Sequence, residues 1–182
     1  TMRSHQTGNY LKSDEGKEML RLKISNGENT DEAIIAFNPN AKNDFDDYDS
    51  EKMFAKNKNL PQLYLMAGEE KLVINGLENI ESNSIIPLGF KTSKAGTFTI
   101  SVNEIEGLDE VDVILEDKLL NKIQDLSNLP TYIFSSDSID NSSRFVLHLK
   151  SASEVNNIGE SKQSYISIYT KEKSIIVDVI SK

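Results

Sequence analysis

The most regular feature of this sequence is a short-range alternation of apolar and polar side chains, which recurs along the chain up to Leu149. The alternation is clearest at residues 20–25, 97–102 and 144–149, where every second side chain is apolar. A period of two is typical of a β-strand with one buried face. Runs of this kind predict about 9 or 10 short strands and no long amphipathic helix. The pattern therefore favours an all-β fold, an antiparallel β-sandwich of the jelly-roll or immunoglobulin-like kind.

Turn residues between these runs indicate which strands pair. An Asn-Gly turn separates residues 20–25 from residues 31–37, and an Ala-Gly-Glu-Glu turn separates residues 63–66 from residues 72–74. Both pairs are predicted to form hairpins. The inward parity of the predicted strands supplies a candidate core, which consists of Ile34, Ile35, Phe37, Phe98, Ile100, Val102, Val113, Leu115, Phe145 and Leu147.

Three other stretches are less regular. Residues 86–90 alternate around a proline and a glycine, which favours an edge strand or a bulge. Residues 121–126 form a hairpin with residues 111–115 in one interpretation, whereas residues 119–126 form a helical turn in the other. Residues 135–143 are polar and predict a loop.

An acidic segment, residues 44–49, follows the strand at residues 31–37. This strand is apolar at both parities, so we expect both of its faces to be covered. In the acidic segment, carboxylates alternate with Phe45 and Tyr48, and a helical turn is predicted at residues 50–56. We expect the two rings to pack. The carboxylates of the segment are Asp44, Asp46, Asp47 and Asp49.

Two interpretations of the acidic segment remain. Calcium takes six to eight oxygen ligands, and the four carboxylates together with Asn38, Asn40 and Asn43 supply several from one loop. The spacing is not that of an EF-hand. We favour the second interpretation, in which Asp46 or Asp47 caps the helical turn and Lys52 neutralises a neighbouring carboxylate. No metal ligand, cofactor or catalytic residue is assigned.

Composition narrows the function classes. The 182 residues carry a net charge of −9, which opposes binding to nucleic acids and to anionic membrane surfaces. Cysteine is absent, and no apolar run approaches the roughly 18 residues of a membrane span. The two histidines, His5 and His148, accompany no Gly-x-Ser-x-Gly motif, and His148 is predicted to be an exposed strand residue. We expect a non-catalytic protein.

Two weaker signals bear on adhesion and modification. Carbohydrate-binding β-sandwiches stack sugars on exposed aromatic rings. Tyr10, Tyr64 and Tyr132 are candidates for such a role here, although packing in the core or at its rim is the favoured interpretation. Asp137-Ser138-Ile139 fits a short acceptor pattern for bacterial O-glycosylation within the predicted polar loop.

The composition changes after Leu149, which predicts three parts. Residues 1–149 form the β-sandwich domain, residues 150–164 a flexible polar linker, and residues 165–182 a C-terminal β-hairpin. An isolated hairpin is marginally stable in water. We therefore expect the hairpin either to dock on the first domain or to open a second one.

An ordered set of short motifs carries a family resemblance. In sequence order they are Met2-Arg3-Ser4-His5-Gln6-Thr7-Gly8-Asn9, Leu20-Arg21-Leu22, Asp31-Glu32, Asp44-Phe45-Asp46-Asp47-Tyr48-Asp49 with Lys52, Pro61-Gln62-Leu63-Tyr64, Ile86-Pro87-Leu88-Gly89-Phe90, Leu115-Glu116-Asp117 and Arg144-Phe145-Val146-Leu147. Residues 1–149 resemble the β-rich region that precedes the sorting domain in secreted and cell-surface proteins of Bacteroidetes-type bacteria. The segment 164–182 resembles the opening strands of a type IX secretion sorting domain.

This resemblance implies a location and partners rather than an activity. It implies export across the outer membrane, residence at the cell surface or in the medium, and contact of the C-terminal segment with the secretion machinery. The family's usual upstream Gly-Asn-Pro-Tyr segment is absent, so residue 1 is expected to fall inside the structural unit. The resemblance predicts a structural accessory region. The alternative is an adhesion or carbohydrate-binding module, assisted by calcium.

Overall fold

The computed structural model describes residues 18–80, 84–151, 165–171 and 174–180, which form strands and no helix. None of these residues belongs to a helix that could span a membrane. The strands are β1 (Glu18–Ser25), β2 (Thr30–Phe37), β3 (Ser50–Glu51), β4 (Gln62–Ala67), β5 (Glu70–Leu77), β6 (Ser84–Thr92), β7 (Gly96–Glu106), β8 (Val111–Asp117), β9 (Lys122–Asp125), β10 (Thr131–Ser136), β11 (Ile139–Ser151), β12 (Tyr165–Lys171) and β13 (Ser174–Ile180).

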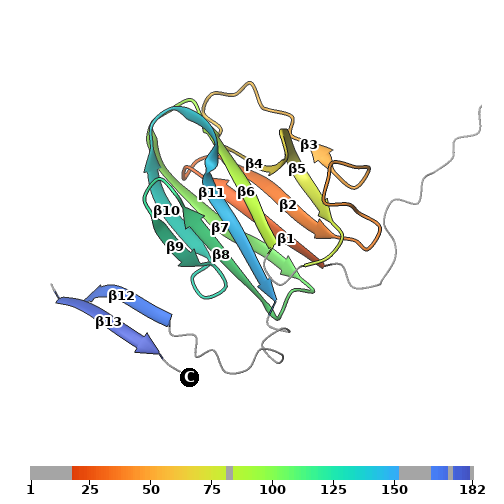
Figure 1. Cartoon of the computed structure of the whole chain (residues 1–182). Coiled ribbons are helices and arrows are strands. Elements are labelled where there is room, and N and C mark those ends of the chain that lie inside the picture. The colour runs from red at the N-terminus through yellow and green to blue at the C-terminus, as the bar shows by residue number, and fades with distance from the viewer. Residues whose placement is uncertain (1–17, 81–83, 152–164, 172–173, 181–182) are drawn as a thin grey trace, which may run out of the picture. The chain divides into compact units, whose positions relative to one another are not determined.

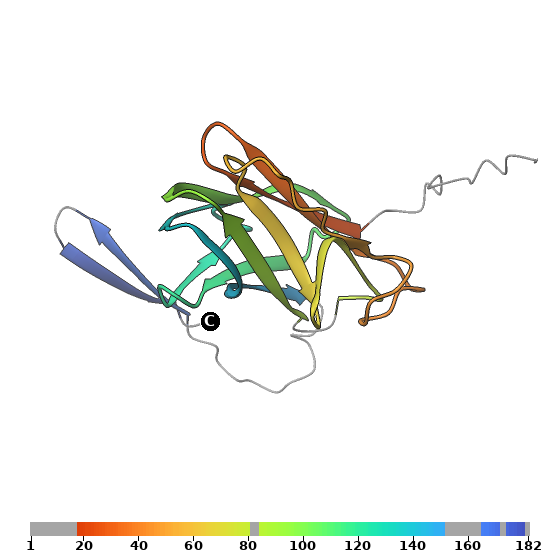
Figure 2. The same ribbon diagram turned by 90° about the horizontal axis from the view of Figure 1, so that it is seen from above.

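The first eleven strands form one sheet that curls round on itself until it is nearly barrel-shaped (Figures 1 and 2). The strand order is β10-β7-β1-β2-β5-β4-β6-β11-β8-β9, and β3 pairs with β5. All pairings are antiparallel except that of β2 with β5. The predicted all-β, mostly antiparallel fold class is therefore confirmed. Its strands belong to one continuously hydrogen-bonded sheet. Since β10 and β9 end the order, the seam of the sheet lies between them.

The predicted hairpins are present. Strand β1 pairs with β2 so that Leu20 lies opposite Ile35, and β4 pairs with β5 so that Leu65 lies opposite Leu72. The turn after β1 contains Gly27, whose φ of 90° suits glycine. Residues 122–125 form strand β9 against β8, so the hairpin interpretation of this stretch is correct and the helical one is wrong.

Two local predictions are wrong, and a third is correct in one of its alternatives. The helical turn expected at residues 50–56 is replaced by β3, because the main chain there pairs with β5 and the Lys52 amide donates to the Lys71 carbonyl. The loop expected at residues 135–143 is mostly strand, since β11 begins at Ile139 and continues past a register shift. For residues 86–90 the edge-strand alternative is wrong, since β6 lies inside the sheet, but a register shift of the bulge kind is present in its pairing with β11, between Asn141 and Phe145. Pro87 is tolerated because pairing with β4 stops at Leu88.

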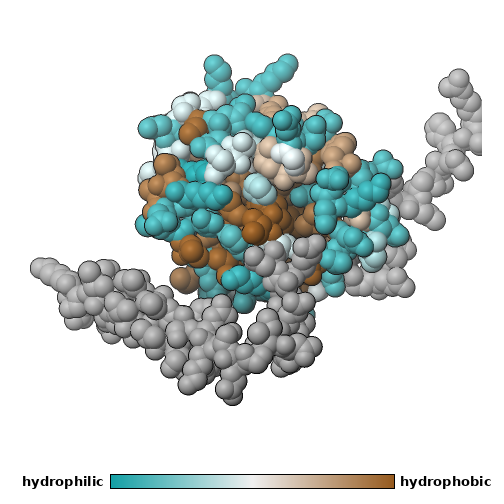
Figure 3. Space-filling model, in the orientation of Figure 1, coloured by the Kyte–Doolittle hydropathy of each residue, from teal (hydrophilic) through white to brown (hydrophobic). Residues whose placement is uncertain are grey.

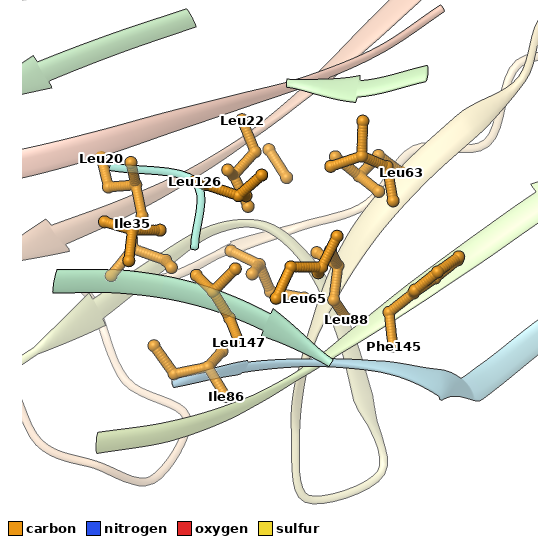
Figure 4. Packing of buried hydrophobic residues seen from close by; sticks show 14 of the residues in the cluster. Leu20, Leu22, Ile35, Leu63, Leu65, Ile86, Leu88, Leu126, Phe145 and Leu147 are labelled. Atoms are coloured by element: carbon orange, nitrogen blue, oxygen red, sulfur yellow. The ribbon is translucent and has the colours of Figure 1, made fainter. Parts of the chain in front are cut away.

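The core fills the space enclosed by the curled sheet. Leu20, Leu22 and Ile35 lie across it from Ile86 and Leu147 (Figure 4). Every predicted core residue is buried except Ile34, Phe37 and Val102, which are partly exposed. Ile34 shows that the second face of β2 is only partly covered. One end of the core is aromatic, with the rings of Phe90 and Phe98 4.9 Å apart.

The chain divides into two units, Thr1–Ala152 and Ser153–Lys182. In the second unit, β12 and β13 form the predicted antiparallel hairpin, in which Ser167 lies opposite Asp178. The predicted linker lies almost wholly outside the described residues, and the predicted division of roles between the two parts stays a prediction.

Candidate functional site

The acidic segment forms a turn held by its own carboxylates. Asp46 accepts hydrogen bonds from the Lys42 amide through Oδ2 and from the Tyr48 amide through Oδ1, both at 2.8 Å. The Asp46 amide in turn donates to Oδ2 of Asp49 at 2.8 Å. Asp46 therefore acts as a cap, as predicted, but it caps a turn rather than a helix.

Asp49 fastens this turn to the sheet. Its Oδ1 accepts a hydrogen bond from the amide of Gly76 in β5, at 2.8 Å. The close approach of the turn to β5 requires glycine at position 76, since a Cβ there would lie 2.6 Å from the Cβ of Tyr48. The acidic segment is thus packed directly against the second half of β5.

The ion-pair partner of Lys52 and the exposure of the two rings differ from the prediction. Lys52 forms an ion pair with Asp31 of β2, which also accepts the amide hydrogen of Leu63 in β4. It therefore neutralises a carboxylate outside the acidic segment. Phe45 and Tyr48 were expected to pack, yet 48% and 41% of their surfaces are exposed. The turn is fixed by hydrogen bonds rather than by burial of its rings.

The outer carboxylates, Asp44 and Asp47, are exposed beside these rings. Within the described part of the chain, no group of three or more His, Cys, Asp or Glu side chains is arranged to hold a metal ion. All four carboxylate oxygens of Asp46 and Asp49 accept hydrogen bonds from main-chain amides. The geometry of the segment is that of a rigid turn that presents two rings and two carboxylates to solvent.

A half-open pocket of about 550 Å³ lies next to this turn. Asn43, from the loop that precedes the acidic segment, forms part of its wall. The remaining described lining residues come from the ends of β4 and β5 and from the start of β6, and they are Met66, Ala67, Gly68, Asn75, Leu77, Asn79, Ser84, Ile85, Ile86 and Pro87. None of these side chains is charged. Sequence analysis missed this pocket because its walls come from segments far apart in the chain.

A second polar cluster lies inside the sheet and was also missed. Asp117 of β8 and Arg144 of β11 are almost completely buried and form an ion pair at 2.8 Å. Oδ2 of Asp117 accepts the phenolic hydrogen of Tyr132 in β10 at 3.0 Å, and Nη1 of Arg144 donates to the Ser135 carbonyl at 3.3 Å. These bonds join β8 and β11 to β10 across the seam of the sheet.

Two tyrosines considered for sugar binding belong to such clusters instead. Tyr132 is 6% exposed and Tyr64 is fully buried, as the favoured packing interpretation predicts. The Tyr64 hydroxyl donates to Asp140 at 2.7 Å, and Asp140 also pairs with Lys71 and Lys91. Burial and this hydrogen bond raise the pKa of Tyr64. Tyr10, the third candidate, lies outside the described residues.

The remaining candidates have ordinary surroundings. His148 is partly exposed, and its Nε2 lies 2.9 Å from a carboxylate oxygen of Glu116 on the neighbouring strand. Ser138, the candidate glycosylation acceptor, is exposed and donates to the Thr92 carbonyl at 3.3 Å. His5 lies outside the described residues.

The Tyr132 hydroxyl provides a test of the buried cluster. Burial and the hydrogen bond to Asp117 raise the pKa of Tyr132 to about 12. Because this folded-state value exceeds the unfolded one of about 10, the associated stability is complete below pH 10 and is lost as the pH rises through 12. An absorbance titration at 295 nm should show late ionisation of both Tyr132 and Tyr64, whose pKa is also raised. The Tyr132→Phe variant should lose the Tyr132 part of this late ionisation and keep that of Tyr64, and an unchanged titration would contradict the assignment.

The bond between Asp49 and Gly76 provides a second test. Asp49→Asn is expected to lower the free energy of unfolding by about 1 to 2 kcal/mol, since it weakens charge-assisted bonds to two amides. Urea denaturation measures the change. Asp47→Asn is the matched control, because Asp47 is exposed on the same turn. Equal effects of the two substitutions would show that Asp49 does not fasten the turn.

Comparisons with known proteins give one match. The model of a family described as "Domain of unknown function (DUF8693)" matches residues 1–149. The comparison with curated proteins and the comparison with solved structures find no match.

Proposed function

We propose that this chain, which belongs to the DUF8693 family, is a non-catalytic accessory region of a secreted or cell-surface protein. In this role the β-domain supports and spaces larger functional domains next to a C-terminal sorting segment. The sorting segment engages the type IX secretion machinery, and the domain itself carries no reaction.

The observation that carries the proposal is the use of the polar side chains inside the domain. Asp117 and Arg144 satisfy each other and Tyr132, Asp31 joins Lys52 to β4, and the inner carboxylates of the acidic segment accept main-chain amides. Each of these groups joins strands or fixes a turn. A domain whose polar groups are committed to its own rigidity is suited to a mechanical or spacing role.

The proposed location is supported by the sequence. The ordered motifs of residues 1–149 and the Ile-rich hairpin at residues 165–180 resemble the end of type IX secreted proteins. We therefore propose export to the cell surface or the medium, with the C-terminal segment as the contact for the secretion machinery.

A second candidate function is adhesion through carbohydrate. It is favoured by the acidic segment, where Phe45 and Tyr48 are exposed between the exposed carboxylates of Asp44 and Asp47. Aromatic faces next to hydrogen-bond acceptors are suited to sugar rings. Asp44 and Asp47 are also the carboxylates of this turn that remain available to calcium.

Retention of the purified chain on a panel of soluble and insoluble polysaccharides separates the two functions. The accessory role predicts no saturable retention in millimolar calcium or in EDTA. Saturable retention that Tyr48→Ser abolishes would establish the adhesion function and overturn the accessory role. Leu119→Ser is the matched control, since Leu119 is exposed on a different turn. Loss of retention in EDTA would further assign the carboxylates to calcium.

A further inference from the structure

Large apolar side chains are exposed together on one part of the domain surface. Five of the ten that are exposed in the described part of the chain lie between residues 119 and 133. They come from the turn after β8, from the edge strand β9, and from the edge strand β10 with the loop before it. Apolar surface is visible on the flank of the domain where β9 and β10 lie (Figures 1 and 3). We call this set the seam patch, and it consists of Leu119, Leu120, Ile123, Leu129 and Ile133.

Hydrogen bonds fix the backbone beneath the seam patch. Oδ1 of Asp117 accepts the amide hydrogens of Leu119 and Leu120, at 3.0 and 3.2 Å. The side-chain amide of Gln124 donates to the Leu129 carbonyl at 3.0 Å, and so joins β9 to the loop before β10. Little backbone entropy is therefore lost when a partner covers these apolar groups. Apolar surface that is both exposed and held in place is typical of an interaction site.

The β8–β9 hairpin carries charges of opposite sign at its two ends. Lys118 and Lys122 are exposed at its tip, where β8 turns into β9. Glu110 and Asp112 are exposed at its other end, where β8 begins, and Asp125 ends β9 on the same side. The whole chain has a net charge of −9, so two copies of it repel each other in most orientations. The basic tip is a place where the acidic surface of another copy is attracted instead.

A two-fold axis matches these charges to each other. When the axis passes through the middle of β9, it sets the hairpins of two copies antiparallel, so the basic tip of each lies beside the acidic end of the other. Ile123, which is 75% exposed, then meets Ile123 of the second copy. Every contact in such an interface occurs twice. A partner of uniform charge would instead be attracted at one end of the hairpin and repelled at the other.

We propose that the seam patch binds a second copy of this chain in a transient, two-fold symmetric homodimer. Ile123 packs at the centre of the interface, and the charged ends of the two hairpins set their antiparallel orientation. The patch consists of five side chains, so the dimer is weak and forms at about 100 μM or above. The chain is therefore monomeric at the lower concentrations of the denaturation and retention experiments. The inference goes beyond the accessory role, which a single chain fulfils.

Sedimentation velocity of the full chain, from about 10 μM to about 500 μM, tests the proposal. The weight-average sedimentation coefficient is expected to rise with concentration towards the value of a dimer. Ile123→Lys should weaken association by about tenfold or more, because it places two ammonium groups together at the axis. Met53→Lys is the matched control, since Met53 is 89% exposed outside the seam patch, and it should leave association unchanged.

A mixture of two charge-reversed variants tests the symmetry. The tip variant combines Lys118→Glu with Lys122→Glu, and the end variant combines Glu110→Lys with Asp112→Lys. Each alone should stay monomeric with the circular dichroism spectrum of the parent, because like charges then face each other. A one-to-one mixture should associate again, since the acidic tip of one variant meets the basic end of the other. Failure of the mixture to associate, a sedimentation coefficient that does not change with concentration, or association that Ile123→Lys leaves intact would overturn the proposal.

Discussion

The Arg144→Met variant is expected to lose about 3 to 5 kcal/mol of the free energy of unfolding, one of the two largest effects anticipated for this protein. Arg144 and Asp117 have side chains that are 1% and 0% exposed. Removal of the guanidinium leaves the Asp117 carboxylate buried without a counter-charge, and the hydrogen bonds from Tyr132 and from the amides of Leu119 and Leu120 do not replace that charge. The loss also removes the cation that lies 4.5 Å from the ring centre of Phe134.

A double-mutant cycle measured by urea denaturation isolates the pair. Asp117→Leu should also destabilise strongly, whereas the double variant should recover much of the loss, because neither charge is then buried alone. Arg21→Met is the matched control. Arg21 pairs with Glu104 on the surface, and such pairs contribute about 0 to 1 kcal/mol. Losses at Arg144 no larger than those at Arg21 would contradict the role assigned to the pair.

The same pair makes the free energy of unfolding depend on pH in the acidic range. Burial of Asp117 opposes its ionisation, but the hydrogen bonds from Arg144 and Tyr132 outweigh this and lower its pKa in the folded protein. The stability that the carboxylate contributes is therefore complete above the unfolded-state pKa of about 3.9 and is lost as the pH falls through the lower folded value. In the double variant this part of the acid dependence should disappear.

The second large effect is expected for Phe98→Ala, which should cost about 3 to 5 kcal/mol. Phe98 is 2% exposed, and its ring centre lies 4.9 Å from that of Phe90 and 5.7 Å from that of Phe134. These neighbours come from separate strands, so they cannot readily close the cavity that the substitution leaves. The unfolding midpoint in urea measures the loss.

Ile133→Ala is the matched control for Phe98→Ala. Ile133 is on β10, which pairs with the strand of Phe98, and it is 67% exposed. Truncation of an exposed side chain changes stability by about 0.5 kcal/mol or less. If the two substitutions had the same effect, Phe98 would not belong to the core.

Local sequence patterns were sufficient to predict most of the strands in the sheet. The alternation in β1 and β7 and the turn chemistry after β1 act over a few residues, so they correctly predicted strands, buried faces and hairpins. The parallel pairing of β2 with β5 was not predictable in this way, because it depends on which distant segments meet. The same reason explains the error at residues 50–56, where pairing with β5 prevails over a local helical tendency.

The buried polar groups were the least predictable part of the site. Asp117 lies at the end of a strand in an acidic stretch, and Arg144 lies at the start of a run of alternating polar and apolar residues. Both positions are typical of exposed residues. Their burial is tolerable because they pair with each other from the neighbouring strands β8 and β11 and bond to Tyr132 and the Ser135 carbonyl of β10 across the seam. Asn75 likewise occupies an unremarkable position in a strand. The acidic segment was found by sequence because its partners, Asp46 and Asp49, lie within a few residues of one another.

The seam has a consequence for how the domain opens. Most neighbouring strands are held by a ladder of main-chain hydrogen bonds, whereas β9 and β10 each have such a ladder on one side only. Across the seam they are joined by side chains, including the Gln124 amide, which donates to the carbonyls of Leu129 and Thr131. In amide hydrogen exchange these two strands should form the least protected cooperative unit of the sheet. We expect unfolding of the domain to begin at its seam, where the hydrogen bonds of Asp117 and Arg144 with β10 set the free-energy cost of the first opening.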